Sequence, residues 1–387
     1  MFITDDVKYI GVDDHNIDLF EGQYIVPNGM SYNSYLIMDE KIAVLDTVDW
    51  NYKEEWLSNL KTALNGKKPD YLVVHHMECD HSAIIGEFLK EYPSTVIVSS
   101  NAAFNMMKNM YGLSFNPSKI VVKEGDILEL GKHSLQFVSA PNVHWPEVMF
   151  SYDKEDKILF SADAFGKFGA LDFDDPEGWA CEARRYYFGI VGKFGVNVQA
   201  ALKKVSAFDI KTICSLHGPI LNDDISYYVN LYDTWSKYEP EEKGVTIAYS
   251  SVYGNTKEAV LFLEEELKKR NVEVSVFDLA RDDQAESVED AFKLDRLVLA
   301  TTTYNGGIFP CMKTFIDHLI DHNYQNRTIS FIENGMWAPQ AMKNMKSLTD
   351  TLKNIKYTNN NVTIKGAVND LVKEQLIKLA DELKELD

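Results

Sequence analysis

The first 240 residues carry their apolar positions mostly in short runs, a pattern typical of β-strands. Residues 53–64 have helical spacing instead, and the run at 69–76 is typical of a strand covered on both faces. Strands dominate, with helices between some of them, which predicts a two-sheet sandwich flanked by helices. The predicted strands are YNSYLIMD (32–39), KIAVLDTV (41–48), PDYLVVHH (69–76), STVIVSS (94–100), KIVVKEGDILEL (119–130), HSLQFVSAP (133–141), EVMFSYD (147–153) and KILFSAD (157–163).

The order of the predicted elements changes after YEPEEKG (238–244), a charged, turn-prone stretch that suits a linker. Strands are predicted at 244–251, 272–279, 296–303 and 328–334, and helices at 256–270, at 315–322 and in two stretches near the C-terminus. This alternation predicts a parallel, doubly wound sheet. A length of 387 residues also favours two domains, which we place at 1–240 and 244–387.

Composition excludes several classes of partner. Thirty-nine Lys and Arg against 59 Asp and Glu give a net charge of -20, which argues against nucleic acid and against an anionic membrane surface. No apolar run is long enough to span a bilayer, and the acidic start lacks the features of a signal peptide. The four cysteines form no C-x-x-C pair, which argues against a rubredoxin-type iron module and favours a reducing cytoplasm.

Metal-binding side chains gather just after apolar runs in the first domain. His76, Glu78, Asp80 and His81 lie within six residues, on the turn that follows the strand YLVV. His144, Asp163 and His217 also follow predicted strands, so all seven can converge on one site. His75 should point the other way on an extended chain. Asp80 could instead cap a helix starting near Ser82. For the remaining four histidines (His15, His133, His318 and His322) we expect ordinary solvated or hydrogen-bonded roles.

Three loops of the second domain predict a flavin site. The segment 250–256, SSVYGNT, lies between a strand and a helix, where backbone N–H groups and hydroxyls can hold a phosphate, although a helix cap has the same composition. Neither a P-loop nor G-x-G-x-x-G is present. Segments 303–307 and 334–338 each bring an aromatic residue and glycine to the same sheet edge, which suits a flat ring on a monophosphate, as in FMN. The candidate FMN-binding residues are Ser250, Ser251, Tyr253, Gly254, Asn255, Thr256, Thr303, Tyr304, Asn305, Gly306, Gly307, Asn334, Gly335, Met336, Trp337 and Ala338.

The metal motif resembles H-x-H-x-D-H of the metallo-β-lactamase superfamily, with Glu78 in place of the second histidine, which shifts the metal preference from zinc towards iron or manganese. With H-W-P (144–146), S-A-D-A-F-G (161–166), H-G-P (217–219), GMSYNSYL (29–36) and D-T (46–47), the chain resembles the flavodiiron proteins, or A-type flavoproteins, over nearly its whole length. The resemblance implies an α/β protein, with a metallo-β-lactamase-like αββα sandwich followed by a flavodoxin-like domain. It also implies one iron on His76, Glu78 and His144, a second on Asp80, His81 and His217, and Asp163 between them, with His81 the least secure ligand.

The resemblance further implies reduction of O2 to water, of NO to N2O, or both, with electrons passed through FMN. It implies a separate electron donor, rubredoxin or a deazaflavin, and a head-to-tail homodimer or homotetramer with Trp145 near the partner's flavin. One departure is Glu21 in F-E-G, where many relatives carry a histidine, so substrate preference does not transfer. Two other hypotheses are a dizinc hydrolase with a regulatory flavodoxin domain and an electron carrier whose first domain is structural.

Overall fold

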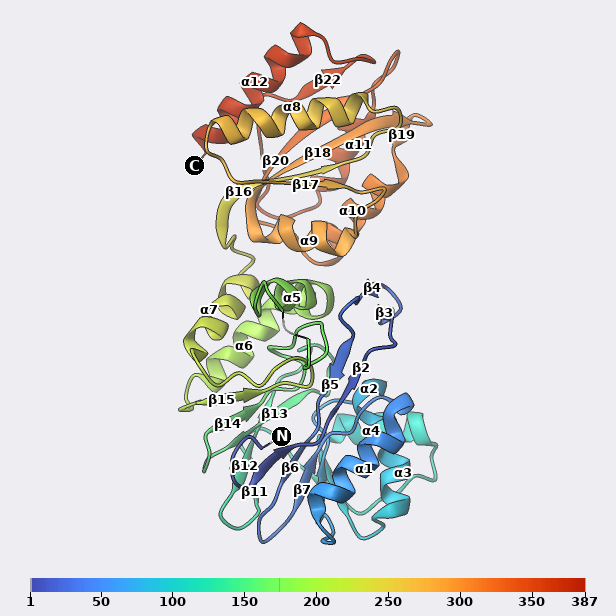
Figure 1. The fold of residues 1–387 in the computed structure, drawn as a ribbon, viewed down its shortest axis with the longest axis vertical. Coiled ribbons are helices and arrows are strands. Elements are labelled where there is room, and N and C mark those ends of the chain that lie inside the picture. Colours follow the sequence, from blue (N-terminus) through green and yellow to red (C-terminus); the bar gives the residue numbers. More distant parts are fainter. Residues whose placement is uncertain (1, 174, 387) are drawn as a thin grey trace. The chain divides into compact units, whose positions relative to one another are not determined.

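The structure is a computed structural model that describes residues 2–173 and 175–386. The chain divides into two compact units, Met1–Asp233 and Thr234–Asp387. Figure 1 shows both as layered α/β folds. Among the described residues, no helix is both long and apolar enough to cross a membrane.

The first unit is a sandwich of two sheets. One sheet has the order β1 (Val7–Tyr9), β6 (Tyr35–Ile37), β7 (Ala43–Leu45), β8 (Tyr71–Val73), β9 (Val96–Ser99) and β10 (Lys119–Val121). The other has the order β11 (Ile127–Glu129), β12 (Ser134–Ser139), β13 (Met149–Asp153), β14 (Ile158–Phe160) and β15 (Thr212–Cys214). Buried side chains from both sheets, such as Val73, Val98, Phe137 and Phe160, form one core between them. The predicted αββα sandwich is confirmed.

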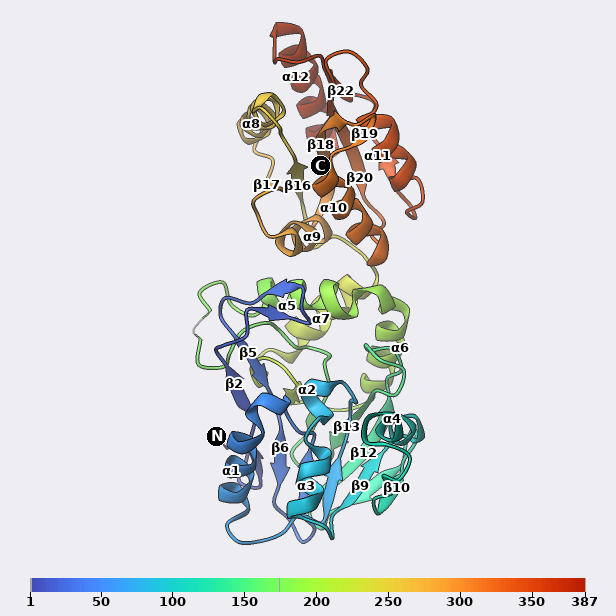
Figure 2. The ribbon, with the colours of Figure 1, turned by 90° about the vertical axis from the view of Figure 1, so that its right-hand side faces the viewer.

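Helices cover the outer faces of this sandwich. Figures 1 and 2 show α1 (Lys53–Leu64), α3 (Ile85–Glu91) and α4 (Asn101–Tyr111) beside the six-stranded sheet, and α6 (Gly195–Val205) and α7 (Ile225–Ser236) beside the five-stranded one. Shorter helices are α2 (Cys79–Ser82), α5 (Ala180–Tyr186), η1 (Trp50–Tyr52), η2 (Tyr187–Val191) and η3 (Gly192–Phe194). Two small ribbons, β2 (Val12–Asp14) with β5 (Met30–Tyr32) and β3 (Leu19–Phe20) with β4 (Tyr24–Ile25), lie outside both sheets.

The second unit is the predicted doubly wound sheet. Its order is β17 (Val274–Asp278), β16 (Glu242–Tyr249), β18 (Leu294–Tyr304), β20 (Thr328–Asn334) and β21 (Lys356–Tyr357), all parallel. β22 (Val362–Ile364) also pairs with β20, and the short β19 (Gly307–Ile308) returns along β18. Apolar residues of α8 (Asn255–Lys269) and α12 (Asp370–Glu385) pack together with those of β16 and β18. Figure 2 shows α9 (Gln284–Lys293), α10 (Pro310–Asp321) and α11 (Ala341–Thr349) completing the helical layers.

Three of the differences from the predicted element boundaries have a clear local cause. The run 119–130 is not one strand: the chain turns at Gly125, whose φ is +80°, and β10 and β11 belong to different sheets. β16 begins at Glu242, inside the predicted linker, because Glu242 already pairs with Leu294. α10 begins at Pro310, five residues before the predicted start, since proline is well suited to the first turn of a helix. Apolar spacing alone carries none of these signals.

Gly29 and Gly22 offer a matched test of backbone packing in the first unit. Their φ values are nearly equal, +70° and +69°, but a Cβ at Gly29 would lie 2.3 Å from the Asp14 carbonyl oxygen, whereas a Cβ at Gly22 would meet nothing within 4 Å. We expect Gly22→Ala to cost about 1 kcal/mol for the left-handed backbone. Gly29→Ala should cost at least about 3 kcal/mol, because backbone must move. Urea unfolding of the two variants checks this, and equal losses would contradict it.

Because of buried His133, the first unit should lose stability as the pH rises into the alkaline range. Its ring contacts Asp153 (Nδ1 to Oδ2, 3.0 Å) and Asp6 (Nε2 to Oδ2, 3.3 Å). Burial lowers the pKa of His133, but the two carboxylates more than offset it and raise the pKa to about 9. The stabilisation is therefore complete below the unfolded-state value of about 6.5 and is lost as pH rises through about 9.

We expect this loss to be on the order of 2 kcal/mol, discounted because Asp6 is partly solvated. Chemical unfolding of the parent and of His133→Asn between pH 6 and 10 measures it. The difference between the two proteins should shrink towards pH 10. A difference that stays constant or grows would show that His133 does not carry the effect.

Candidate functional site

Strand ends in the first unit deliver the predicted metal ligands. β8 ends at Val73, and the chain then passes through His76 and Glu78 into α2, which contains Asp80 and His81. His144 lies on the loop between β12 and β13, Asp163 follows β14 and His217 follows β15. The structure brings all seven together in two groups of ligand atoms that lie within 4.8 Å of one another.

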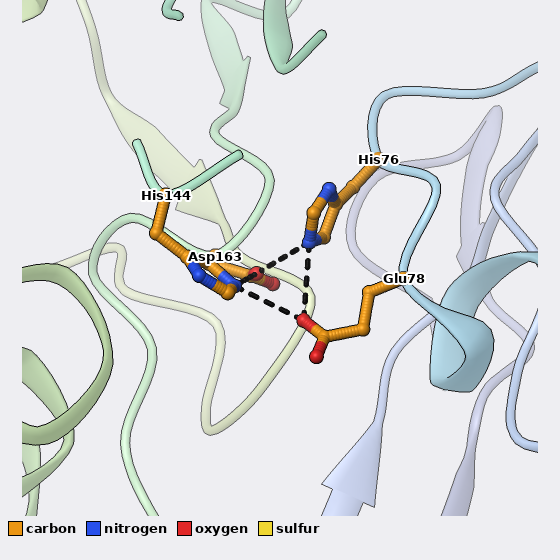
Figure 3. A group of neighbouring side chains, drawn as sticks. All are labelled: His76, Glu78, His144 and Asp163. Carbon is orange, nitrogen blue, oxygen red and sulfur yellow. Dashed lines mark hydrogen bonds and ion pairs between the residues drawn. The ribbon is translucent and has the colours of Figure 1, made fainter. Parts of the chain in front are cut away.

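The first group consists of His76, Glu78, His144 and Asp163, shown in Figure 3. The Nε2 atoms of His76 and His144 lie 3.2 and 3.0 Å from Oε2 of Glu78. The same two nitrogens lie 3.2 and 3.1 Å from Oδ2 of Asp163. Four donor atoms therefore converge on one point from three separate loops.

The second group consists of Asp80, His81 and His217. The Nε2 atoms of both histidines lie 3.3 Å from Oδ2 of Asp80 and only 3.0 Å from each other. Oδ1 of Asp163 lies 3.4 Å from Nε2 of His81 and 3.8 Å from Nε2 of His217. Asp163 therefore presents one oxygen to each group, as a bridging carboxylate does.

The chemistry of these residues fits two metal ions. Both carboxylate oxygens of Asp80 and of Asp163 are buried and accept no hydrogen bond of good geometry. Buried polar atoms normally find a partner, so orphaned oxygens beside imidazole nitrogens point to metal coordination. Three carboxylates among seven ligands favour iron or manganese over zinc. The alternative in which Asp80 caps a helix is wrong: Glu78 is the N-cap residue of α2, and Asp80 lies inside it.

Charge within the cluster is balanced between carboxylates and imidazoles. Burial lowers the pKa of His144, but Asp163 and Glu78 outweigh it and raise the pKa to about 9. Burial alone would raise the pKa of Asp163, yet the His76 charge and the surrounding imidazoles hold it well below the ordinary value. A metal ion must therefore displace protons from the histidines as it binds.

Three aromatic side chains, none of them a predicted site residue, surround the second group. The rings of Phe20, Tyr186 and Tyr32 lie 5.3, 5.6 and 5.9 Å from the ring of His217, measured between centroids. The hydroxyl of Tyr186 is buried and makes no hydrogen bond. No local motif marks Tyr186, because only the fold brings it to the metal ligands.

Glu21 also reaches this region. It sits at the turn of the β3–β4 hairpin with a φ of +50°, and its carboxyl lies close enough to that of Glu78 for the two charges to interact. Burial, with the negative charge of Glu78, raises the pKa of Glu21 to about 7. The residue that departs from the family pattern therefore lies beside the first group of ligands.

Histidines outside the two groups have other partners. Nδ1 of His75 lies 2.6 Å from Oδ2 of Asp46, and Nε2 lies 2.8 Å from the Ser151 hydroxyl. His133 is held by the carboxylates described above, and exposed His15 lies 3.3 Å from Asp172. His75 accordingly points away from the metal ligands, as an extended chain requires.

A cavity of about 650 Å³ opens at the carboxyl ends of β16, β18, β20 and β22 in the second unit. It is lined by thirteen of the sixteen candidate FMN residues, all except Ser250, Gly254 and Gly307. The Ser250 hydroxyl is buried and pairs with that of Thr301, at 2.6 Å. Gly254 supplies the left-handed N-cap of α8, and Gly307 pairs with Tyr304 across the β18–β19 turn. Four further residues line the cavity: Val252, inside the predicted phosphate segment, and Thr302, Gln340 and Gly366, which were not predicted.

Two predicted residues tie the cavity loops together. Oγ1 of Thr303 accepts hydrogen bonds from the backbone N–H groups of Gln340 and Ala341, at 2.9 and 3.1 Å. The Asn334 side chain pairs with both backbone groups of Gly366. Trp337, by contrast, is 90% exposed at the cavity. An amide-rich loop at one end and free aromatic faces at the other fit a phosphate joined to a flat ring.

Comparison with known proteins agrees with both halves of the chain. Residues 30–218 match the ODP family beta lactamase, and residues 246–370 match a flavodoxin domain. A nitric oxide reductase of Moorella thermoacetica is 32% identical over 334 residues, which cover 84% of this chain and 83% of that protein. An anaerobic nitric oxide reductase flavorubredoxin of Citrobacter koseri is 28% identical over 359 residues, which cover 90% of this chain and 74% of that protein.

Solved structures share the whole fold. The flavodiiron protein from Giardia intestinalis superposes with a TM-score of 0.93 at 26% identity, covering 99% of this chain and 95% of that one. Rubredoxin oxygen:oxidoreductase from Desulfovibrio gigas has the same TM-score at 24% identity, covering 100% and 98%.

A metallo-β-lactamase-like unit with paired histidine–carboxylate groups, followed by a flavodoxin unit, defines a two-domain redox protein. The chain belongs to the flavodiiron protein family and is an oxidoreductase. Its flavodoxin domain and histidine–carboxylate groups agree with the expected FMN and diiron cofactors.

Proposed function

We propose that this protein reduces NO to N2O and O2 to water at a non-haem diiron site, with electrons supplied through FMN. The observation that carries the proposal is Asp163, a buried carboxylate whose two oxygens face two separate groups of ligands. The names of its relatives support both gases, nitric oxide for the Moorella protein and oxygen for the Desulfovibrio one.

In this proposal His76, Glu78 and His144 hold one iron, Asp80, His81 and His217 hold the other, and Asp163 bridges them. The cavity residues of the second unit hold FMN, with loop 250–256 at the phosphate and Trp337 against the ring. When bound, FMN supplies electrons one at a time and the iron pair offers open coordination positions for a diatomic gas.

Side chains of the protein surround the positions at which the gas would bind. Phe20, Tyr32 and Tyr186 exclude bulk water from the His217 side of the centre. The Tyr186 hydroxyl is available as a hydrogen-bond donor there, since no described residue hydrogen-bonds with it. Glu21 places a further carboxyl beside Glu78, on the opposite group. Reduction of NO consumes two electrons and two protons per N2O, and reduction of O2 consumes four of each, so groups that carry protons belong at this site.

The proposal also covers the oligomeric state of the protein, its electron donor and its cellular compartment. The FMN cavity and the metal ligands belong to different units, so we expect a head-to-tail homodimer or homotetramer in which Trp145 lies near the partner's flavin. A small redox protein such as rubredoxin is the expected donor. The four cysteines form no disulfide among the described residues, which supports a reducing cytoplasm.

Gas consumption by the reduced protein tests the proposal directly. Protein loaded anaerobically with iron and FMN is reduced and mixed separately with NO and with O2, while flavin absorbance, N2O and peroxide are followed. We expect N2O from NO and loss of O2 without peroxide, and the faster reaction identifies the preferred gas. If neither gas reoxidises the flavin, the proposal fails. Zinc-dependent hydrolysis by the same protein would then favour the hydrolase.

A further inference from the structure

Glu147 lies on the loop that carries His144 and hydrogen-bonds with the loop that carries His76. It follows His144 by three residues and is 2% exposed. Its Oε1 lies 2.8 Å from Nδ1 of His76 and accepts a hydrogen bond of 2.9 Å from the backbone N–H of Met77. Because an ionised carboxylate only accepts hydrogen bonds, Nδ1 of His76 must carry a proton. Nε2 of His76, which faces Glu78 and Asp163, is then the nitrogen that a metal can bind.

The histidines of the second group lack such support. Nδ1 of His217 lies 2.7 Å from the backbone oxygen of Ser31, a neutral acceptor. Nδ1 of His81 is buried and makes no hydrogen bond with any residue that the structure describes. Among these three ligand histidines, a charged partner therefore stands only behind His76.

A carboxylate behind a metal-binding imidazole has two known consequences. It fixes the tautomer and the ring orientation, and it makes the coordinating nitrogen a better electron donor. Loss of such a partner typically weakens metal binding about tenfold to a hundredfold. The same logic predicts that a histidine without an outer partner, such as His81, contributes a weaker bond.

We propose that Glu147 is a positioning residue that makes the His76–Glu78–His144 half of the centre the tighter half and the first to take up iron. The Asp80–His81–His217 half fills second and loses its metal first. This inference rests on the proposed function only in requiring that the two ligand groups bind iron.

The test uses ordered iron loading of the full-length protein without its metal. One and then two equivalents of ferrous ⁵⁷Fe are added anaerobically, and Mössbauer spectra and competition with a chelator give the environment and affinity of each iron. Glu147→Gln keeps an oxygen for Met77 but removes the charge, so the fold should survive. Asp153→Asn is the matched control, because Asp153 is also buried and also faces a histidine, His133, outside the two ligand groups.

We expect the parent to show one spectral component after the first equivalent and a second, weaker-binding one after the next. Glu147→Gln should alter the first spectral component and lower the affinity for the first iron about tenfold to a hundredfold. Asp153→Asn should change neither component, even if it lowers stability. If Glu147→Gln does not fold, Glu147→Asp replaces it in the test. This variant shifts the carboxylate by one methylene and is expected to lower the affinity for the same iron.

Unchanged first-iron affinity and spectrum in a folded Glu147 variant would overturn the inference, as would an effect confined to the second iron. Neither result would touch the proposed function, because the parent would still bind two irons. A parent protein that binds no iron would instead defeat the proposed function itself.

Discussion

Replacing Asp163 with asparagine is expected to remove much of the iron and to slow NO and O2 reduction by at least about a hundredfold. Loss of a mere outer partner of a ligand costs about ten- to a hundredfold in affinity or activity, and Asp163 contacts both ligand groups directly. The amide also carries no charge to balance His76 and His144. Iron content per chain and gas consumption by the reduced protein measure the two effects.

Asp153→Asn provides the comparison for this variant. Asp153 is buried in the same unit and also pairs with a histidine, so general damage to folding should be similar. We expect Asp153→Asn to retain its iron and its activity. An Asp163→Asn protein that keeps two irons per chain would show that Asp163 does not bridge the metals.

Trp337→Ala is expected to weaken FMN binding about tenfold to a hundredfold, because a large aromatic face no longer covers the flavin ring. The side chain is 90% exposed, so its removal should leave the stability of the second unit nearly unchanged. Titration of the FMN-free protein, followed by quenching of flavin fluorescence, gives the dissociation constants.

Trp50→Ala is a suitable control, since Trp50 is half exposed, lies in the first unit and stacks with Lys53. It should leave FMN affinity at the parent value. Equal affinity in the parent and in Trp337→Ala would place the flavin ring elsewhere in the cavity.

The fold and the clustering of the candidate metal ligands were predictable because their signals are local. Each ligand lies a few residues after an apolar run, and H-x-E-x-D-H concentrates His76, Glu78, Asp80 and His81 in six positions. The parallel neighbours β14 and β15 deliver Asp163 and His217 to one edge of their sheet. The packing of the two sheets then brings in the residues that follow β8 in the other sheet and His144 from the loop between antiparallel β12 and β13. The doubly wound sheet was equally readable from the alternation of strands and helices.

The surroundings of the site could not be read in this way. Tyr186 and Phe20 reach His217 from segments far apart in the chain; no motif marks Tyr186, and the F-E-G segment does not indicate that Phe20 contacts His217. Glu147 follows the H-W-P segment directly, but its role depends on a contact with His76, 71 residues away. Gly366 enters the FMN cavity because Asn334 holds its backbone. Residues that act through tertiary contacts leave no periodic signal in a single sequence.

The β3–β4 hairpin contributes no strand to either sheet, yet it carries Phe20 to His217 and Glu21 to Glu78. The sandwich that positions the candidate metal ligands and the hairpin that lies beside them are thus separate parts of the structure. Substitutions at the hairpin tip, where a Cβ at Gly22 meets open space, leave the sheets undisturbed. The residues that approach the candidate metal site can therefore change in evolution without any change in the residues that form the site. The seven-residue hairpin can likewise be exchanged by design to alter what surrounds the site.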